Sequence, residues 1–279
     1  MRKLINLLEL IKFSHTIFAL PFALISMMVA ARGIPSVEIF GWIVISMVGA
    51  RTSAMGFNRY LDWEIDQRNP RTVIRSTLAS KRESLLLTGL GTILFFGAVM
   101  QLNSLCLFLS PIALALVWGY SWLKRFTIWC HLGLGFALSA APMGAWAAVR
   151  GDLGSLGPWL LAFAVLWWVF GFDLIYATQD AEFDRKAGLY SIPAKLGIER
   201  TLLFARGAHG LTFLALGLFG WESGFGICYW IAYAIVAGAL VYEHYLCREV
   251  EDLGKMNRAF FVVNGVIGIV LFAGVAWGQ

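Results

Sequence analysis

The chain consists of long apolar runs that alternate with shorter polar and charged segments. An apolar run of about 20 residues in an α-helix is long enough to cross the hydrocarbon core of a bilayer. The runs that reach or approach this length cover residues 16–31, 39–57, 84–100, 104–121, 131–148, 158–177, 204–220, 227–245 and 259–277. The pattern predicts an all-α, polytopic integral membrane protein, a bundle of nine transmembrane helices.

The composition supports the same fold class. Of the 279 residues, 59% are hydrophobic and only 14% are charged, and the mean hydropathy is +0.73. Soluble domains contain about 25% charged residues, so this chain is expected to fold in a lipid bilayer. Residues 1–15 contain Lys and Arg but also Glu9, and they lack a small-residue cleavage site. They therefore indicate an interfacial amphipathic helix rather than a signal peptide.

The distribution of charge predicts how the helices are oriented. With nine spans, one side of the membrane receives the turn-rich segments 32–36, 151–157 and 220–226, and the other receives the charged segments 58–83, 122–130, 178–203 and 246–258. Of 22 Lys and Arg residues, only Arg32 and Arg150 fall on the first side. The positive-inside rule then predicts a protein of the cytoplasmic membrane with its N-terminus and charged loops in the cytoplasm. This topology explains the net charge of +5 without a nucleic-acid partner.

Two groups of polar side chains end two of the predicted spans. Asn58, Asp62 and Asp66 are four residues apart after the second span, and Asp180 and Asp184 repeat that spacing after the sixth. Side chains at positions i and i+4 share one face of a helix. Two helix ends can therefore direct oxygen ligands to a common point.

Arg51 and Asp173 extend these groups deeper into the apolar spans. Each lies seven residues before the first member of its group, on the same helical face. A charge inside a span is energetically costly and usually faces a cavity, whereas Glu64 and Glu182 are off these faces and are expected to be solvated. We therefore expect residues 1–279 to form one domain around a central cavity open to the cytoplasmic side.

The clustered carboxylates predict a metal site. Four carboxylates at one point repel one another unless cations neutralise them. The candidate ligands are all oxygens, which favours Mg²⁺ over Zn²⁺, because Mg²⁺ binds carboxylate, water and phosphate oxygens. The histidines have no ligand spacing and are expected to be packed or interfacial: His15, His131, His209 and His244. Basic residues that flank the acidic groups include Arg71, Arg75, Lys124 and Arg125, although positive-inside bias also explains each of them.

Four sequence blocks follow one another in register with the predicted spans. They are R-x6-N-R-x-x-D-x-x-x-D (51–66), SWLKRFT (121–127), DLIYATQDAEFD (173–184) and GxxSIPAKLG (188–197). Together they resemble the UbiA superfamily of intramembrane prenyltransferases over essentially the whole chain. Segments 10–24 and 131–146 are similar to the 4-hydroxybenzoate polyprenyltransferase-like branch, which includes the naphthoate prenyltransferase of the futalosine route to menaquinone. One departure is that Arg75 is followed by STLAS, where the family has a stretch resembling RPLPSG, which puts the role of Arg75 in question.

The resemblance implies Mg²⁺-dependent transfer of a polyprenyl group. The donor is polyprenyl diphosphate, and the acceptor is the ring of a hydroxy-aromatic acid of the 4-hydroxybenzoate or dihydroxynaphthoate type, in quinone biosynthesis. Two magnesium ions are expected to join the diphosphate to Asn58, Asp62, Asp66, Asp180 and Asp184. The residues expected to hold the outer diphosphate oxygens are Lys124, Arg125, Arg71 and Arg75.

The other candidate residues each have two interpretations. Asp173 either orients or deprotonates the acceptor hydroxyl, or pairs with Arg51 or another buried cation. Arg51 and Lys12 either bind an aromatic carboxylate or pair with the acids. Aromatic residues near the span ends either surround a carbocation or form the interfacial belt: Phe57, Tyr60, Trp118, Trp122, Phe172 and Tyr176. Glu243 and His244 are expected to be interfacial rather than catalytic.

Two kinds of alternative function stay open: a prenyltransferase with another acceptor, and a protein that is not a prenyltransferase. In the same fold, the acceptor can be haem, chlorophyllide or glyceryl phosphate. A cation transporter also has intramembrane acids, but near the midplane and on discontinuous helices. The acidic groups here end their spans beside cationic segments, which suits a phosphate head group better.

Overall fold

The computed structural model describes residues 16–248 and 253–278, except for the side chains of residues 16–18, 75 and 253, and all regular elements in this part are helical. The long helices are α2 (Thr16–Ala31), α3 (Val37–Leu61), α6 (Lys81–Val99), α7 (Ser104–Leu123), α8 (Cys130–Arg150), α9 (Leu156–Ala177), α12 (Ile198–Ser223), α13 (Ile227–Leu246) and α15 (Asn264–Gly278). The short ones are α4 (Trp63–Arg68), α5 (Arg75–Leu78), a 3₁₀ turn (Thr178–Asp180), α10 (Ala181–Ala187), α11 (Ile192–Leu196), α14 (Leu253–Asn257) and a π-helical turn (Arg258–Val263). The all-α prediction is confirmed.

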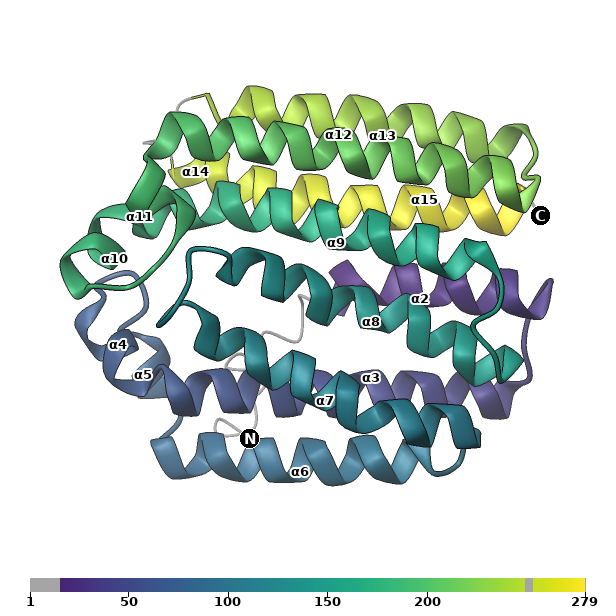
Figure 1. The fold of residues 1–279 in the computed structure, drawn as a ribbon, viewed down its shortest axis with the longest axis horizontal. Coiled ribbons are helices and arrows are strands. Elements are labelled where there is room, and N and C mark those ends of the chain that lie inside the picture. Colours follow the sequence, from purple (N-terminus) through teal and green to yellow (C-terminus); the bar gives the residue numbers. More distant parts are fainter. Residues whose placement is uncertain (1–15, 249–252, 279) are drawn as a thin grey trace.

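The long helices lie side by side with their axes roughly aligned, as Figure 1 shows. α3 packs against α6, α9 packs against α8 and α12, and α13 packs against α15. The short helices α4, α5, α10 and α11 gather at one end of the bundle, on the left in Figure 1. Since α4 carries Asp66 and α10 carries Asp184, the two groups of acidic residues, far apart in the sequence, meet at this end.

Glycine residues allow α3 and α6 to approach very closely. A Cβ atom on Gly91 would lie 2.4 Å from the backbone nitrogen of Ser53, and one on Gly49 would lie 2.6 Å from that of Phe95. Such backbone contact is typical of membrane helix pairs, because lipid tails are as apolar as the side chains and packing must supply the attraction. The close pair holds α3, which carries the first acidic group, in a fixed position.

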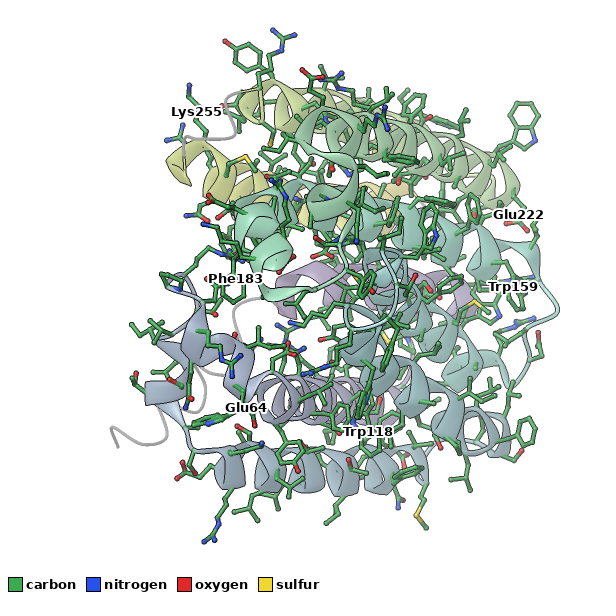
Figure 2. All side chains as sticks on the ribbon, turned by 60° about the vertical axis from the view of Figure 1, so that its left-hand side comes forward. Glu64, Trp118, Trp159, Phe183, Glu222 and Lys255 are labelled. Carbon is green, nitrogen blue, oxygen red and sulfur yellow. The ribbon has the colours of Figure 1, made fainter. Side chains whose placement is uncertain are left out.

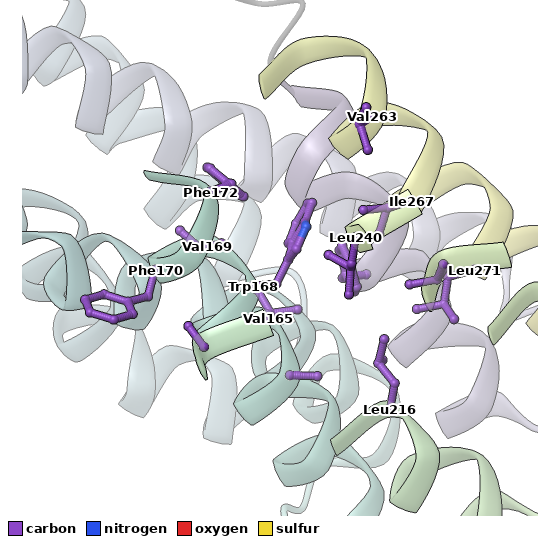
Figure 3. Packing of buried hydrophobic residues seen from close by; sticks show 14 of the residues in the cluster. Val165, Trp168, Val169, Phe170, Phe172, Leu216, Leu240, Val263, Ile267 and Leu271 are labelled. Atoms are coloured by element: carbon purple, nitrogen blue, oxygen red, sulfur yellow. The ribbon is translucent and has the colours of Figure 1, made fainter. Parts of the chain in front are cut away.

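α9 lies within the larger hydrophobic core. Trp168 is fully buried and packs against Phe22 and Phe172, with ring centroids 4.8 and 5.0 Å away. Leu216 of α12 and Leu240 of α13 belong to the same cluster, which Figure 3 shows from close by. Apolar neighbours on every side explain why the sequence of α9 is almost continuously hydrophobic.

Eight helices in the described part are long and apolar enough to cross a membrane, and they match eight of the predicted runs. The first predicted run coincides with α2, and within the described residues its apolar helix Ala19–Ala31 is shorter than the other eight. The protein is thus a multi-span membrane protein, and the count of nine spans stays a prediction. The predicted amphipathic helix at residues 1–15 lies outside the described residues.

A buried polar cluster joins α9, α12, α13 and α15. Asn264 accepts a hydrogen bond from Trp168 Nε1 (2.7 Å) and donates one to Glu243 Oε1 (2.8 Å). Ring nitrogens of His209 and His244 lie 3.0 Å apart. Glu243 is 0% exposed, so the prediction that it is interfacial was wrong. Polar groups buried in a membrane protein must find partners inside it, and this cluster connects the four helices.

Candidate active site

Each acidic group lies where a long helix gives way to a short one. α3 and α4 meet at Asp62, whose φ of −88° and ψ of 7° interrupt the helix. Backbone hydrogen bonds from Asp62 to Asn58 and from Asp66 to Asp62 keep the chain on a helical path across the interruption. Similarly, a 3₁₀ turn that ends at Asp180 separates α9 from α10. Asn58 Nδ2 also donates to Asp62 Oδ2 at 3.3 Å, so the first group stays together although α3 ends before Asp62.

A buried arginine that was not among the predicted site residues joins two members of the first group. Arg59 is 8% exposed, and its Nη1 donates to Asp66 Oδ2 at 2.5 Å. Its Nη2 donates to Asn58 Oδ1 at 2.6 Å. Hydrogen bonds between ionised partners are about twice as strong as neutral ones. A cation next to Asn58 at the end of an apolar span was the available sequence signal for this role.

Asp62 faces the basic segment that follows α7. Its carboxylate is nearly buried, with Lys124 Nζ 2.6 Å from Oδ2 and Arg125 Nη2 3.4 Å from Oδ1. Arg125 Nη2 also donates to the carbonyl oxygen of Leu61 at 2.8 Å, which fixes the end of α3. The structure thus places the predicted Lys124 and Arg125 beside the first acidic group.

Asp180, from the second group, meets residues that follow the first. Asn69 Nδ2 and Arg71 Nε donate to Asp180 Oδ1 at 3.0 and 2.8 Å, and Arg71 Nη2 pairs with Oδ2. The Arg71 guanidinium lies over the Tyr176 ring, 4.8 Å from its centroid. Partial burial alone would lower the pKa of Arg71, but hydrogen bonding and the charge of Asp180 outweigh burial and raise it. Arg71 therefore stays charged and links the two halves of the protein.

Asp184 lies close to the same point. Ser191 hydrogen-bonds its carboxylate, and Asp180 and Lys124 are near enough to act on its charge. Lys124 pairs with Asp62 of the first group, and its charge also acts on Asp184 of the second.

The segments that carry the two groups face each other across a hollow of about 380 Å³, lined by residues of the 61–68 segment, Arg125, Ala187 and Leu189. Figure 2 shows Glu64 and Phe183 at the same end of the bundle, opposite Trp159 and Glu222. The expected solvation of two glutamates is confirmed: the exposed pairs are Glu64 with Lys81 at 3.4 Å and Glu182 with Lys186 at 2.7 Å.

A cavity of about 670 Å³ extends from this end into the bundle. Its polar lining residues include Arg51, Asn58, Arg59, Asp173 and Tyr176, and most of its other walls consist of apolar side chains from α3, α7 and α8. Arg51 and Asp173 therefore face a cavity, as their positions inside spans predicted.

Asp173 pairs with a histidine. His131 Nδ1 lies 2.7 Å from Asp173 Oδ2, and in the described part of the chain this is the only hydrogen-bond or ion-pair partner of Asp173. The histidine was expected to be an ordinary packed or interfacial residue; it is 5% exposed, but it has this specific contact. Its partner lies 42 residues away in the sequence, so local spacing gave no indication of the pair.

The predicted aromatic residues separate into two sets. Phe172 and Tyr176 line the cavity, whereas the others are not among its lining residues: Phe57, Tyr60, Trp118 and Trp122. The physical reason is that these four contact other side chains. Phe57 stacks on Trp118 with ring centroids 5.3 Å apart and lies near Trp122, and the Tyr60 ring is 5.4 Å from Lys81 Nζ.

Two predicted site residues cannot be placed by their side chains. Lys12 lies outside the described residues. The backbone of Arg75 begins α5, but its side chain is also outside the described part.

The donor atoms at the acidic end fit magnesium. Every candidate ligand offers oxygen, and Asp62 and Asp66 are 3% and 6% exposed. Among the described residues, no three or more His, Cys, Asp or Glu side chains are grouped so that they alone could hold a metal ion. Mg²⁺ does not need one, because it binds through one or two carboxylates together with phosphate oxygens and water.

Comparisons with known proteins agree with this geometry. A profile of the UbiA prenyltransferase family matches residues 19–273. The 4-hydroxybenzoate octaprenyltransferase of Yersinia enterocolitica is 34% identical over 251 residues, which are 88% of this chain and 85% of that protein.

Solved structures show the same fold. A UbiA homologue from Aeropyrum pernix K1 superposes with a TM-score of 0.84 at 31% identity, over 94% of this chain and 96% of that one. A UbiA homologue from Archaeoglobus fulgidus bound to GPP and Mg²⁺ gives a TM-score of 0.72 at 17% identity, over 97% and 98%. The family profile and the Yersinia relative favour an enzyme over the alternative of a cation transporter. The chain belongs to the UbiA prenyltransferase family.

Proposed function

We propose that this enzyme transfers a polyprenyl group from polyprenyl diphosphate to the ring of a hydroxy-aromatic acid, of the 4-hydroxybenzoate or dihydroxynaphthoate type, in quinone biosynthesis. The observation that carries the proposal is the meeting of two acidic groups, with their basic partners, at the polar end of an apolar cavity. The name of the Yersinia relative supports the choice of an aromatic acceptor.

The acidic end is electrically balanced before substrate charge is added. Its carboxylates are Asp62, Asp66, Asp180 and Asp184, and the basic side chains that act on them are Arg59, Arg71, Lys124 and Arg125. A diphosphate of charge about −3 therefore needs further positive charge of similar size, which two divalent cations provide.

Magnesium would be held by Asn58, Asp62, Asp66, Asp180 and Asp184, and when bound it stabilises the negative charge that develops on the diphosphate as the allylic C–O bond breaks. The magnesium and GPP in the Archaeoglobus homologue support this choice of metal and donor. Lys124 and Arg71 are placed to bind outer phosphate oxygens, because each already holds a carboxylate oxygen at this end. Arg125 serves the same site while it anchors the end of α3.

The cavity suits a long apolar chain. Its lining reaches from Asn58 at the acidic end to Leu153 and Trp159, and Figure 2 shows Trp159 at the opposite end of the bundle. Walls of this kind exclude water, which would otherwise convert an allylic cation to an alcohol. Tyr176 and Phe260 stack with centroids 4.1 Å apart and form an aromatic part of the cavity wall.

Two residues on the wall are suited to the acceptor. Arg51 offers a cation for the carboxylate of an aromatic acid, and Asp173 offers a carboxylate for its hydroxyl group. The ring carbon ortho to that hydroxyl then attacks the allylic carbon. We place the acidic end at the cytoplasmic face of the membrane, because nearly all Lys and Arg residues belong to segments on that side.

The test is an assay of purified enzyme with radiolabelled polyprenyl diphosphate. We expect prenylated product with 4-hydroxybenzoate or dihydroxynaphthoate in Mg²⁺, and none in EDTA or with glyceryl phosphate. Asp62→Ala and Asp180→Ala should abolish turnover, whereas Glu182→Ala, which removes an exposed carboxylate next to the second group, should not. Metal-dependent activity retained in both aspartate variants would rule out the assigned site, and turnover of glyceryl phosphate alone would refute the aromatic acceptor.

A further inference from the structure

Asp173 is an acid in an unusual place. It lies on α9 seven residues before Asp180, about 10 Å along the helix axis, and it lines the cavity. Its side chain is 23% exposed. One carboxylate oxygen, Oδ2, is taken by His131, and no described residue hydrogen-bonds the other. The second oxygen is therefore available to a molecule in the cavity.

His131 is held against Asp173 by the packing of α8 on α9. It lies in the first turn of α8, and Gly135, one turn later, faces the same helix. A Cβ atom on Gly135 would lie 2.6 Å from the carbonyl oxygen of Leu166, so only glycine permits this approach of the two helices. The His131 imidazole is buried between α8 and α9, so the packing of these two helices fixes its position.

The imidazole has Asp173 as its hydrogen-bond partner and also lies close to the thiol of Cys130, the preceding residue. Its Nδ1 makes the 2.7 Å contact, and its Nε2 is buried without a hydrogen-bond partner in the described part of the chain. The hydrogen bond from His131 holds the Asp173 carboxylate in one orientation on the cavity wall.

We propose that His131 is a positioning residue for the acceptor: it holds Asp173 in the orientation in which this carboxylate accepts the proton of the acceptor's hydroxyl group. The inference rests on the proposed function. It assigns to the His131–Asp173 pair the selection of acceptors that carry a ring hydroxyl, and it leaves prenyl diphosphate binding to the acidic end.

The proposed step balances. As the allylic C–O bond breaks, its electron pair leaves with the diphosphate. The ring carbon ortho to the hydroxyl forms the new C–C bond while Asp173 takes the hydroxyl proton, which gives a cyclohexadienone. The ring proton at that carbon then leaves with the diphosphate, and Asp173 returns its proton to the oxygen, which restores the aromatic phenol. His131 contributes orientation at Asp173 Oδ2 and exchanges no atoms with the substrate.

The experiment separates the two substrates by their kinetic constants. His131→Leu removes the hydrogen bond, and His131→Asn keeps one donor near the position of Nδ1. We expect His131→Leu to lower kcat/KM for the aromatic acid about 10- to 100-fold, the size of a hydrogen bond to a charged group. The KM for prenyl diphosphate should stay unchanged, and His131→Asn should restore most of the loss.

A double variant tests whether His131 acts through Asp173. In the Asp173→Asn background, the further change His131→Leu should lower kcat/KM for the aromatic acid only slightly. The carboxylate that His131 positions is already absent there. His209→Asn is the matched control: it alters another buried histidine that has a polar partner but lies outside the cavity lining, and it should leave both KM values unchanged.

The outcomes distinguish the inference from the proposed function. If the wild-type enzyme prenylates no aromatic acid, the proposed function fails and the inference with it. If the wild type is active, three results would each overturn the inference alone. They are a rise in the KM for prenyl diphosphate equal to that for the aromatic acid, no recovery of kcat/KM in His131→Asn, and additive losses of kcat/KM in the double variant. Thermal midpoints measured in parallel show whether each variant is folded, and His131→Asn still decides the matter if His131→Leu is not.

Discussion

Arg59 offers a direct test of how the acidic end is held together. Its guanidinium bridges Asp66 at 2.5 Å and Asn58 at 2.6 Å, and the paired side chains of Arg59 and Asp66 are 10% and 8% exposed. Arg59→Met keeps the aliphatic part of the side chain but removes both contacts. The variant therefore leaves the Asp66 carboxylate buried without its main compensating charge.

The size of the effect follows from burial. Removal of one partner from a buried ion pair costs about 3–5 kcal/mol, and each kcal/mol lowers the Tm of a protein of this size by roughly 2–4 °C. We expect Arg59→Met to lower the Tm by roughly 6–20 °C in EDTA. The matched control is Lys186→Met, whose ion pair with Glu182 has side-chain exposures of 75% and 78%, and it should leave the Tm unchanged.

Magnesium should oppose this loss. In Arg59→Met the oxygens of Asp66 and Asn58 lose the Arg59 guanidinium, which competes with a hard cation, so the variant should gain more stability from Mg²⁺ than the wild type does. At a Mg²⁺ concentration of about 100 times Kd the gain is about 2.7 kcal/mol. The assay is thermal unfolding of detergent-purified protein in EDTA and in MgCl₂. The reasoning is refuted if Arg59→Met is no less stable than Lys186→Met, or if Mg²⁺ raises the Tm of both Arg59 forms equally.

Three further predictions concern helix packing, diphosphate binding and the buried polar cluster. Gly91→Ala should lower the Tm and the yield of folded protein, because its Cβ would lie 2.4 Å from Ser53 N, whereas Gly97→Ala meets nothing within 4 Å and should be neutral in the same thermal assay. Arg71→Lys loses the bidentate contact with Asp180 and should raise the KM for prenyl diphosphate about tenfold. The kcat/KM for the acceptor is measured alongside, and an unchanged KM for prenyl diphosphate would contradict a role of Arg71 in diphosphate binding. Trp168→Phe removes a buried 2.7 Å hydrogen bond to Asn264 and should destabilise the protein by about 1–3 kcal/mol, and a denaturation midpoint equal to that of the wild type would show that Asn264 finds another partner.

Much of the candidate site was predictable from local spacing. Asn58, Asp62 and Asp66 lie on successive turns, and Asp180 and Asp184 repeat the pattern, because i, i+4 geometry is a property of one helix and needs no tertiary information. Arg51 and Asp173 also face the cavity as predicted, because a charge inside a span avoids lipid.

The partners of these residues were less predictable. Arg59 was overlooked although it is adjacent to Asn58, since one cation among many at a span end resembles positive-inside bias. Asn69 and His131 carried no signal, because each finds its partner on an element distant in the sequence. The two interpretations of the aromatic residues could not be separated from the sequence, since position along a helix does not reveal which neighbour covers a ring.

The sequence by itself determined that the protein crosses a membrane on apolar helices, where most of those helices begin and end, and that a group of acidic residues follows two of them. The sequence is sufficient for this because backbone N–H and C=O groups inside the hydrocarbon core must be hydrogen-bonded within their own segment. Apolar runs therefore form helices, and the thickness of the bilayer sets the length of those helices. Only the tertiary structure decided which cation meets which acid. The contacts of Asp180 with Arg71, Asp62 with Arg125 and Asp173 with His131 span 109, 63 and 42 positions. They depend on how whole helices pack, and that packing depends on glycine contacts and side-chain fit across the bundle rather than on any local pattern.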